Sequence, residues 1–126
     1  QFPNKSFDYV ILSQTLQAFL DPENVIKELL RIGKQAIVTI PNFGYWKIRL
    51  HLLLKGTMPV TRTLPDEWYN TPNIHLCTIK DFEWLCEECG INIIEKRFFD
   101  NSGKENLFTA LLPNFFSSTA IYKISK

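Results

Sequence analysis

The chain has 126 residues, of which 45% are hydrophobic, 21% are charged and 13% are aromatic. This apolar content excludes a disordered chain, and the length suits one domain or part of one. The net charge of +1 gives no general attraction to nucleic acid or to an anionic membrane. No apolar run approaches the roughly 20 residues that span a bilayer. We therefore expect neither nucleic acid nor a membrane as a partner.

The chain contains three cysteines and begins at Gln1, without a methionine or a signal-peptide pattern. An odd number of cysteines does not build a disulfide framework, so a reducing, cytoplasmic setting is expected. The absent methionine suggests a fragment of a longer protein. Because there is no internal repeat and no linker, we expect residues 1–126 to form one partial domain with no internal boundary.

The first third of the chain predicts a strand, a helix and a second strand. Residues 7–12 (FDYVIL) are typical of a strand buried on both faces. Asp21 and Pro22 have the character of an N-cap and a first-turn proline, and Gly33 is expected to end this helix in a left-handed conformation. Residues 36–40 (AIVTI) predict a second buried strand. A unit of this kind is right-handed and favours a doubly wound α/β sheet.

The remainder of the chain adds further elements around one long irregular stretch, residues 56–77. Loops of this length in a compact domain tend to be functional. Thr78 is expected to N-cap a helix that Gly90 ends. The other predicted elements are a largely apolar helix at 45–55, strands at 91–99 and 120–125, and either a short helix or an irregular strand within 107–116.

Motifs for phosphate and metal binding are missing or weak. The five glycines all stand alone, so no glycine-rich loop can cradle a pyrophosphate. Cys86 and Cys89 form a C-x-x-C that could be half of a zinc site, but no second pair follows. Free cysteines on the apolar face of a helix more often pack in the core. We predict core packing and no metal.

Polar side chains follow the first two predicted strands at the points where these strands end. Ser13 and Gln14 follow the first strand, and Asn42 follows the second. Ligands of open α/β sheets bind outside the carboxyl ends of the strands. A purely structural interpretation is equally open, in which Ser13 caps the next segment and Asn42 forms a turn. In the long loop, Tyr69 and His75 fit either a pocket wall or a small core beneath the loop.

Longer sequence strings resemble a known family. Residues 2–11 (FPNKSFDYVI) are similar to the fourth-strand region of class I S-adenosylmethionine-dependent methyltransferases. Four further strings closely resemble the methionine biosynthesis protein MetW family: 12–17 (LSQTLQ), 40–46 (IPNFGYW), 58–61 (MPVT) and 67–78 (EWYNTPNIHLCT). The resemblance covers nearly the whole chain.

This resemblance implies the rear part of a Rossmann-like methyltransferase sheet, with parallel strands, an antiparallel last strand, and the N-terminal strands missing. It also implies a bacterial, cytoplasmic protein that acts with homoserine O-acyltransferase in methionine synthesis. The alternative is an S-adenosylmethionine-dependent methyltransferase that acts on an unknown small molecule. Whether the protein is an enzyme is left open, and no residue is assigned a catalytic role.

The family's glycine-rich cofactor loop and its ribose-binding acidic residue would lie before Gln1. The residues that the resemblance assigns to S-adenosylmethionine are therefore limited to the end of the fourth strand, where Ser13, Gln14 and Gln17 would face the methionine end of the cofactor. The candidates on the substrate side are Asn42, Tyr69 and His75. We expect this chain alone to bind the cofactor weakly or not at all, and to be inactive alone.

Overall fold

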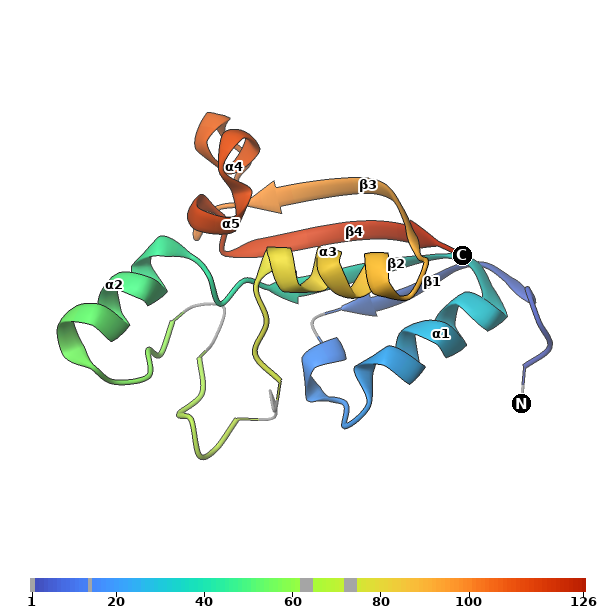
Figure 1. Ribbon diagram of the computed structural model, residues 1–126, viewed down its shortest axis with the longest axis horizontal. Coiled ribbons are helices and arrows are strands. Elements are labelled where there is room, and N and C mark those ends of the chain that lie inside the picture. Colours follow the sequence, from blue (N-terminus) through green and yellow to red (C-terminus); the bar gives the residue numbers. More distant parts are fainter. Residues whose placement is uncertain (1, 14, 62–64, 72–74) are drawn as a thin grey trace.

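The structure is a computed structural model that describes residues 2–13, 15–61, 65–71 and 75–126 (Figure 1). Its centre is a four-stranded sheet of order β1-β2-β4-β3. Strand β1 pairs with β2 in parallel, whereas β4 is antiparallel to both of its neighbours, β2 and β3. The α/β fold with an antiparallel last strand is therefore confirmed. The strands are β1 (Phe7–Ser13), β2 (Gly33–Pro41), β3 (Asn92–Phe99) and β4 (Thr119–Ser125).

Helices α1 (Pro22–Ile32) and α3 (Ile79–Glu88) lie on the same face of the sheet (Figure 1). Both begin where predicted. The Asp21 carboxylate accepts a hydrogen bond from the Asn24 N–H at 3.2 Å, and Thr78 forms a complete capping box with Asp81. Side chains of the two helices form one core with every second residue of the central strands. The fully buried members include Ile26, Leu30, Val38, Ile40, Cys86, Tyr122 and Ile124.

The expectation that the first strand is buried on both faces is wrong. Strand β1 is at the edge of the sheet, and Phe7, Tyr9 and Ile11 are 41%, 55% and 69% exposed. These three side chains lie on the face opposite the core, which none of the described helices covers (Figure 1). An unbroken apolar run cannot distinguish a strand inside a sheet from an edge strand with one bare face, because both carry the same residues.

Gly33 does not form the predicted left-handed helix cap. Its φ is −112°, which is extended, and it is the first residue of β2. A Cβ at this position would lie 2.6 Å from Cγ2 of Val10, so the glycine allows α1 to turn closely into the sheet. Gly90, in contrast, has a φ of +67°, the left-handed value predicted for the end of its helix.

The remaining elements surround one end of the sheet. A 3₁₀ helix, η1 (Leu16–Ala18), follows β1, and α2 (Trp46–Lys55) extends away from the end of β2 (Figure 1). The ambiguous stretch 107–116 forms two short helices, α4 (Leu107–Leu111) and α5 (Pro113–Phe116). Among the described residues, no helix has the length and apolar character needed to cross a bilayer.

Candidate functional site at the carboxyl ends of β1 and β2

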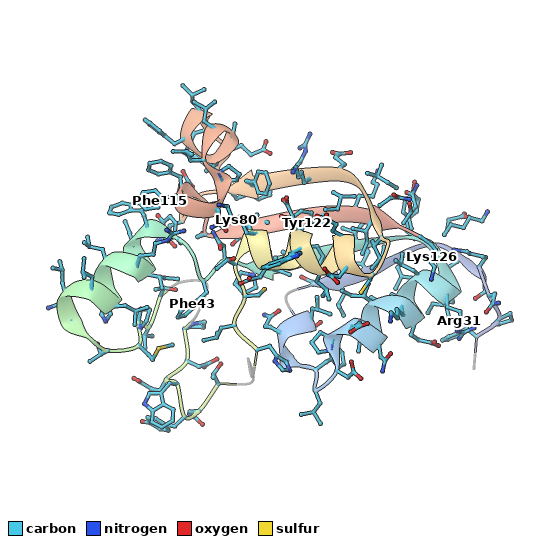
Figure 2. The ribbon with its side chains drawn as sticks, in the orientation of Figure 1. Arg31, Phe43, Lys80, Phe115, Tyr122 and Lys126 are labelled. Atoms are coloured by element: carbon cyan, nitrogen blue, oxygen red, sulfur yellow. The ribbon has the colours of Figure 1, made fainter. Side chains whose placement is uncertain are left out.

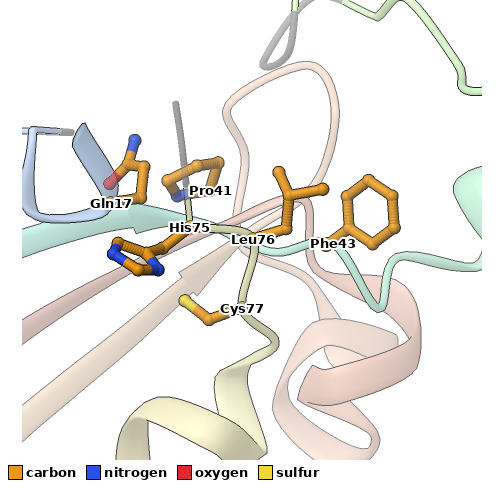
Figure 3. A pocket seen from close by; sticks show the side chains of 6 residues that line it. All are labelled: Gln17, Pro41, Phe43, His75, Leu76 and Cys77. Carbon is orange, nitrogen blue, oxygen red and sulfur yellow. The ribbon is translucent and has the colours of Figure 1, made fainter. Parts of the chain in front are cut away.

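The segment 75–77 connects the two strand ends that the sequence singled out. The His75 N–H donates to the carbonyl of Gln17 in η1 at 2.8 Å, and the Phe43 N–H donates to the carbonyl of Cys77 at 3.0 Å. The loop therefore passes across the carboxyl ends of both β1 and β2. Figure 3 shows the imidazole of His75 on the side of Gln17, and Leu76 between Pro41 and Phe43.

Two adjoining cavities lie at this edge. The smaller has a volume of about 10 Å³ and is lined by the six residues drawn in Figure 3. This is room for about one water molecule. The larger cavity, of about 180 Å³, shares Gln17, His75 and Cys77 with the first and extends under α3 to Phe82 and Leu85. The site is thus a mostly apolar hollow whose lining also includes the imidazole of His75, the amide of Gln17 and the carboxylate of Asp81.

His75 is an exposed polar group of this site with room to meet a ligand, and the Asp81 carboxylate, which also lines the larger cavity, is another. The side chain of His75 is exposed, and Nε2 lies 3.4 Å from the carbonyl oxygen of Leu20. A neutral imidazole can donate through one ring nitrogen and accept through the other, so His75 suits an orienting hydrogen bond to a small molecule. Gln17 is 5% exposed and forms the wall behind it.

Cys77 is not a nucleophile at neutral pH. Burial, with a smaller contribution from the nearby Asp81 carboxylate, raises the pKa of the Cys77 thiol to about 11. The thiolate, which is the nucleophilic form, is therefore scarce at neutral pH. A Cys–His catalytic pair formed by His75 and Cys77 is not supported by this environment. Cys77 contributes apolar surface to the hollow.

Asn42 occupies the interior and does not line either cavity. It is 1% exposed. Its Nδ2 donates to the carbonyls of Ser117 and Asn114 at 2.7 and 3.0 Å, and its Oδ1 accepts from the N–H groups of Gly44 and Ile79 at 2.9 and 3.1 Å. The amide group has no capacity left for a substrate. Asn42 instead holds together the segments that frame the site.

The other predicted site residues are not brought together with His75. Tyr69 is 72% exposed on a turn beside Trp68, with the two ring centroids 5.6 Å apart, and it lines neither cavity. Ser13 is exposed at the end of β1 opposite Thr39. Gln14 lies outside the described residues. The loop therefore divides into a segment near the strand ends and a distant aromatic turn.

The sequence places Phe43 beside Asn42 at the end of the second strand, but it did not indicate Leu76 or Phe82 as part of the apolar wall of the site. Phe43 and Leu76 line the smaller cavity, and Phe82 lines the larger. Phe43 directly follows Asn42, and Leu76 lies next to His75, so proximity in sequence to the candidate residues was the available signal. Phe82 is the fourth residue of α3, and nothing in the sequence connects it to the loop.

The described residues do not fit a complete S-adenosylmethionine site. Sheets that bind nucleotide cofactors use a glycine-rich turn and an acidic residue on the ribose. Gly44 is close to the site, but it leaves no room for a cofactor to approach its backbone. A Cβ built on Gly44 would lie 3.1 Å from atoms of Asn114 and Thr78, so residues of this chain already occupy that space. The Asp81 carboxylate accepts from the Thr78 N–H at 3.1 Å. The cavity of about 180 Å³ is also smaller than the roughly 300 Å³ typical of ligand clefts.

The C-x-x-C motif packs as predicted. Cys86 is 1% exposed, and Cys89 lies partly buried against the same core. Burial raises the pKa of the Cys86 thiol to about 12, as expected for a thiol packed in the core. Within the described part of the chain, no group of three or more His, Cys, Asp and Glu side chains is placed to hold a metal ion.

The fold of the chain is similar to that of Rossmann-like methyltransferases. A structure of an S-adenosylmethionine-dependent methyltransferase from Thermotoga maritima matches 99% of this chain and 58% of its own, with a TM-score of 0.60 and 18% identity. One from Methanosarcina mazei matches 100% of this chain and 62% of its own, with a TM-score of 0.60 and 15% identity. At such identities the likeness shows the fold alone.

The family model described as methionine biosynthesis protein MetW matches residues 1–124, and the chain belongs to this family. A curated relative, the bifunctional methionine biosynthesis protein MetXA/MetW of Rhodopirellula baltica, is 36% identical over 121 residues. The aligned region covers 95% of this chain and 19% of that relative. The chain therefore spans about one fifth of the length of this curated relative.

Proposed function

We propose that this chain is the rear part of a cytoplasmic, bacterial MetW-like protein that acts with homoserine O-acyltransferase in methionine synthesis. The observation that carries the proposal is the MetXA/MetW relative, in which a segment 36% identical to this chain is part of a bifunctional protein. The family resemblance supplies the acyltransferase as the partner. The methyltransferase-like fold by itself does not identify a substrate.

Joining two proteins in one chain has a physical consequence that supports a partnership. A linker holds the two modules at an effective concentration that reaches the millimolar range. If two such modules work together as separate chains, a direct contact between them would supply the proximity that the linker provides. We therefore propose that this MetW-like protein binds the acyltransferase directly.

The test is to mix the full-length protein with homoserine O-acyltransferase from the same organism. Size-exclusion chromatography with light scattering gives the mass of the complex, and acyl transfer is measured with and without the MetW-like protein. We expect a complex of defined stoichiometry and a changed rate of acyl transfer. Two proteins that elute separately, with an unchanged rate, would contradict the proposal.

A second candidate function is methyl transfer from S-adenosylmethionine to a small molecule, and the methyltransferase-like fold favours it. In the full-length protein, Ser13, Gln14 and Gln17 would lie toward the methionine end of the cofactor, and His75 toward the acceptor. Methyl transfer can depend on positioning the acceptor, so the lack of an obvious base does not exclude it. Titration calorimetry of the full-length protein with S-adenosylmethionine tests this function.

A further inference from the structure

A larger groove lies away from the candidate site, between α3, β3 and the two C-terminal helices. Its volume is about 400 Å³. We call it the α3–α5 groove, and Figure 2 labels Lys80 and Phe115 at its borders. The residues that line it are Arg49, Ile79, Lys80, Glu83, Lys96, Leu111, Leu112, Pro113, Asn114 and Phe115.

The charge of this groove is unbalanced. Three of its lining residues are cations and one is an anion, which leaves two positive charges uncompensated. The single carboxylate, Glu83, is already engaged: it lies 3.4 Å from Nζ of Lys96 and accepts a hydrogen bond from the hydroxyl of Tyr122 at 2.8 Å. Among the described residues, the ion pairs do not include Arg49 or Lys80. The net charge of the whole chain is +1, so this is a local concentration of positive charge.

Arg49 is held in place over the groove. Its Nε donates to the carbonyl of Gly44 at 2.6 Å, and its guanidinium carbon lies 5.1 Å from the centroid of the Phe115 ring. The outer nitrogens of a guanidinium fixed in this way present N–H donors in the geometry that carboxylates prefer. The cation is therefore preorganised beside an apolar surface.

The apolar wall continues beyond the groove onto α4. Leu111 and Leu112 line the groove and are 68% and 57% exposed. Leu107 and Phe108, one turn earlier, are 67% and 61% exposed without lining it. A small ligand would fill the groove and leave these side chains bare. Apolar side chains exposed together and bordered by charges are typical of a surface that binds another protein.

We propose that the α3–α5 groove docks an acidic segment of a partner protein that carries leucine or aromatic side chains. The apolar side chains of that segment pack against Leu111, Leu112 and Phe115, and its carboxylates meet Arg49 and Lys80. The sign of the uncompensated charge selects an acidic partner over a basic one. The proposal does not depend on which protein supplies the segment.

The test uses a fluorescein-labelled amphipathic peptide with leucines on one face and glutamates on the other, titrated with the full-length protein. We expect binding that weakens as salt is raised. Leu111→Asp and Lys80→Glu should each weaken it by about tenfold or more. Both side chains are exposed, so neither change should disturb folding, which circular dichroism verifies. The matched controls, Leu20→Asp and Lys126→Glu, alter an exposed leucine and a lysine outside the groove and should leave binding unchanged.

Several results would overturn the proposal. One is a peptide with lysines in place of the glutamates that binds as tightly as the acidic peptide. Another is binding of the acidic peptide to Leu111→Asp and Lys80→Glu that is as tight as its binding to the control variants. Vesicles of anionic lipid could be bound in a Lys80- and Leu111-dependent way while the acidic peptide is not, which would assign the groove to a membrane surface. Variant-sensitive binding of hexanoate, without peptide binding, would assign it to a small carboxylate.

Discussion

The side chain of Asn42 accepts a hydrogen bond from the backbone N–H of Ile79 at 3.1 Å, although the two residues are 37 positions apart in sequence. This bond connects the turn after β2 to the first residue of α3. The same side chain reaches two carbonyls around α5. One amide group therefore fixes how the segment 75–78 enters the helix, and so how the candidate site is framed.

Replacing Asn42 by alanine should destabilise the fold strongly. Four backbone groups would lose their side-chain partner, and a buried group left unsatisfied costs roughly 1–3 kcal/mol. We expect Asn42→Ala to lower the free energy of unfolding by about 3 kcal/mol or more, measured by urea denaturation. Asn70→Ala, at an exposed position of the long loop, is the matched control and should change little. Equal stability of the two variants would contradict the structural role of Asn42.

His75 should behave as a site residue and not as a core residue. Its side chain is exposed, and Nε2 lies 3.4 Å from the carbonyl oxygen of Leu20, while its hydrogen bond to Gln17 uses the backbone. His75→Ala should therefore lower the free energy of unfolding by less than about 1 kcal/mol, yet weaken small-molecule binding by the full-length protein. A large drop in melting temperature without a change in binding would show that His75 has a structural role.

The two edge strands differ in how well they resist pairing with another chain. Strand β3 carries three consecutive charged residues, Glu95, Lys96 and Arg97, whereas the single charge within β1 is Asp8. Charged side chains protect an edge from unwanted pairing. This difference identifies β1 as the edge exposed to self-association.

We therefore expect the isolated 126-residue chain to self-associate through β1, and light scattering to show it. Ile11→Lys should reduce the association, because Ile11 is 69% exposed. Val10→Lys is a less suitable probe, since Val10 contacts the position of Gly33. Ile94→Lys, at the opposite edge, is the control. A chain that stays monomeric at high concentration would show that the edge of β1 is protected.

Alkaline pH should weaken the fold through its buried thiols. The pKa of Cys77 is raised from an ordinary value of 9.0 to about 11, chiefly by burial. Below pH 9 the thiol is protonated in both the folded and the unfolded chain. Between pH 9 and about 11 the unfolded chain releases a proton that the folded chain retains, so stability falls as pH rises.

This dependence can be measured from urea denaturation at about pH 8 and about pH 10. Cys77→Ser removes the titrating thiol and should reduce the loss of stability between the two conditions. Cys86, whose pKa is raised to about 12, retains its own contribution in the variant. An identical loss in the wild type and in Cys77→Ser would show that Cys77 is not buried as described.

S-adenosylmethionine should bind this 126-residue chain weakly or not at all. The described residues provide no glycine-rich turn: Gly44 at the site stands alone, and atoms of Asn114 and Thr78 fill the space beside it. Titration calorimetry of the chain beside the full-length protein measures the difference. Micromolar binding by the chain itself would contradict this expectation.

Features that depend on neighbours in sequence could be predicted, and features that depend on distant contacts could not. Asp21 and Thr78 identified the helix starts because a cap bonds within three residues. The exposure of Tyr9 depends on whether another element covers that face of the sheet, and the residues around Tyr9 in sequence do not indicate this. The role of Asn42 depends on carbonyls 72 and 75 residues away. The sequence singled out the long loop as a whole, but the separation of His75 from the turn at Tyr69 required the structure.

Strand β4 is the last strand along the chain, but it lies between β2 and β3 in the sheet (Figure 1). During synthesis, β2 and β3 leave the ribosome before β4. They do not pair with each other in the sheet, because β4 lies between them. The apolar residues of β2 therefore cannot be fully buried until Ala120, Tyr122 and Ile124 of β4 have been synthesised. A premature stop before Thr119 would yield a nascent chain with two separated strand edges, a substrate for chaperones or proteases.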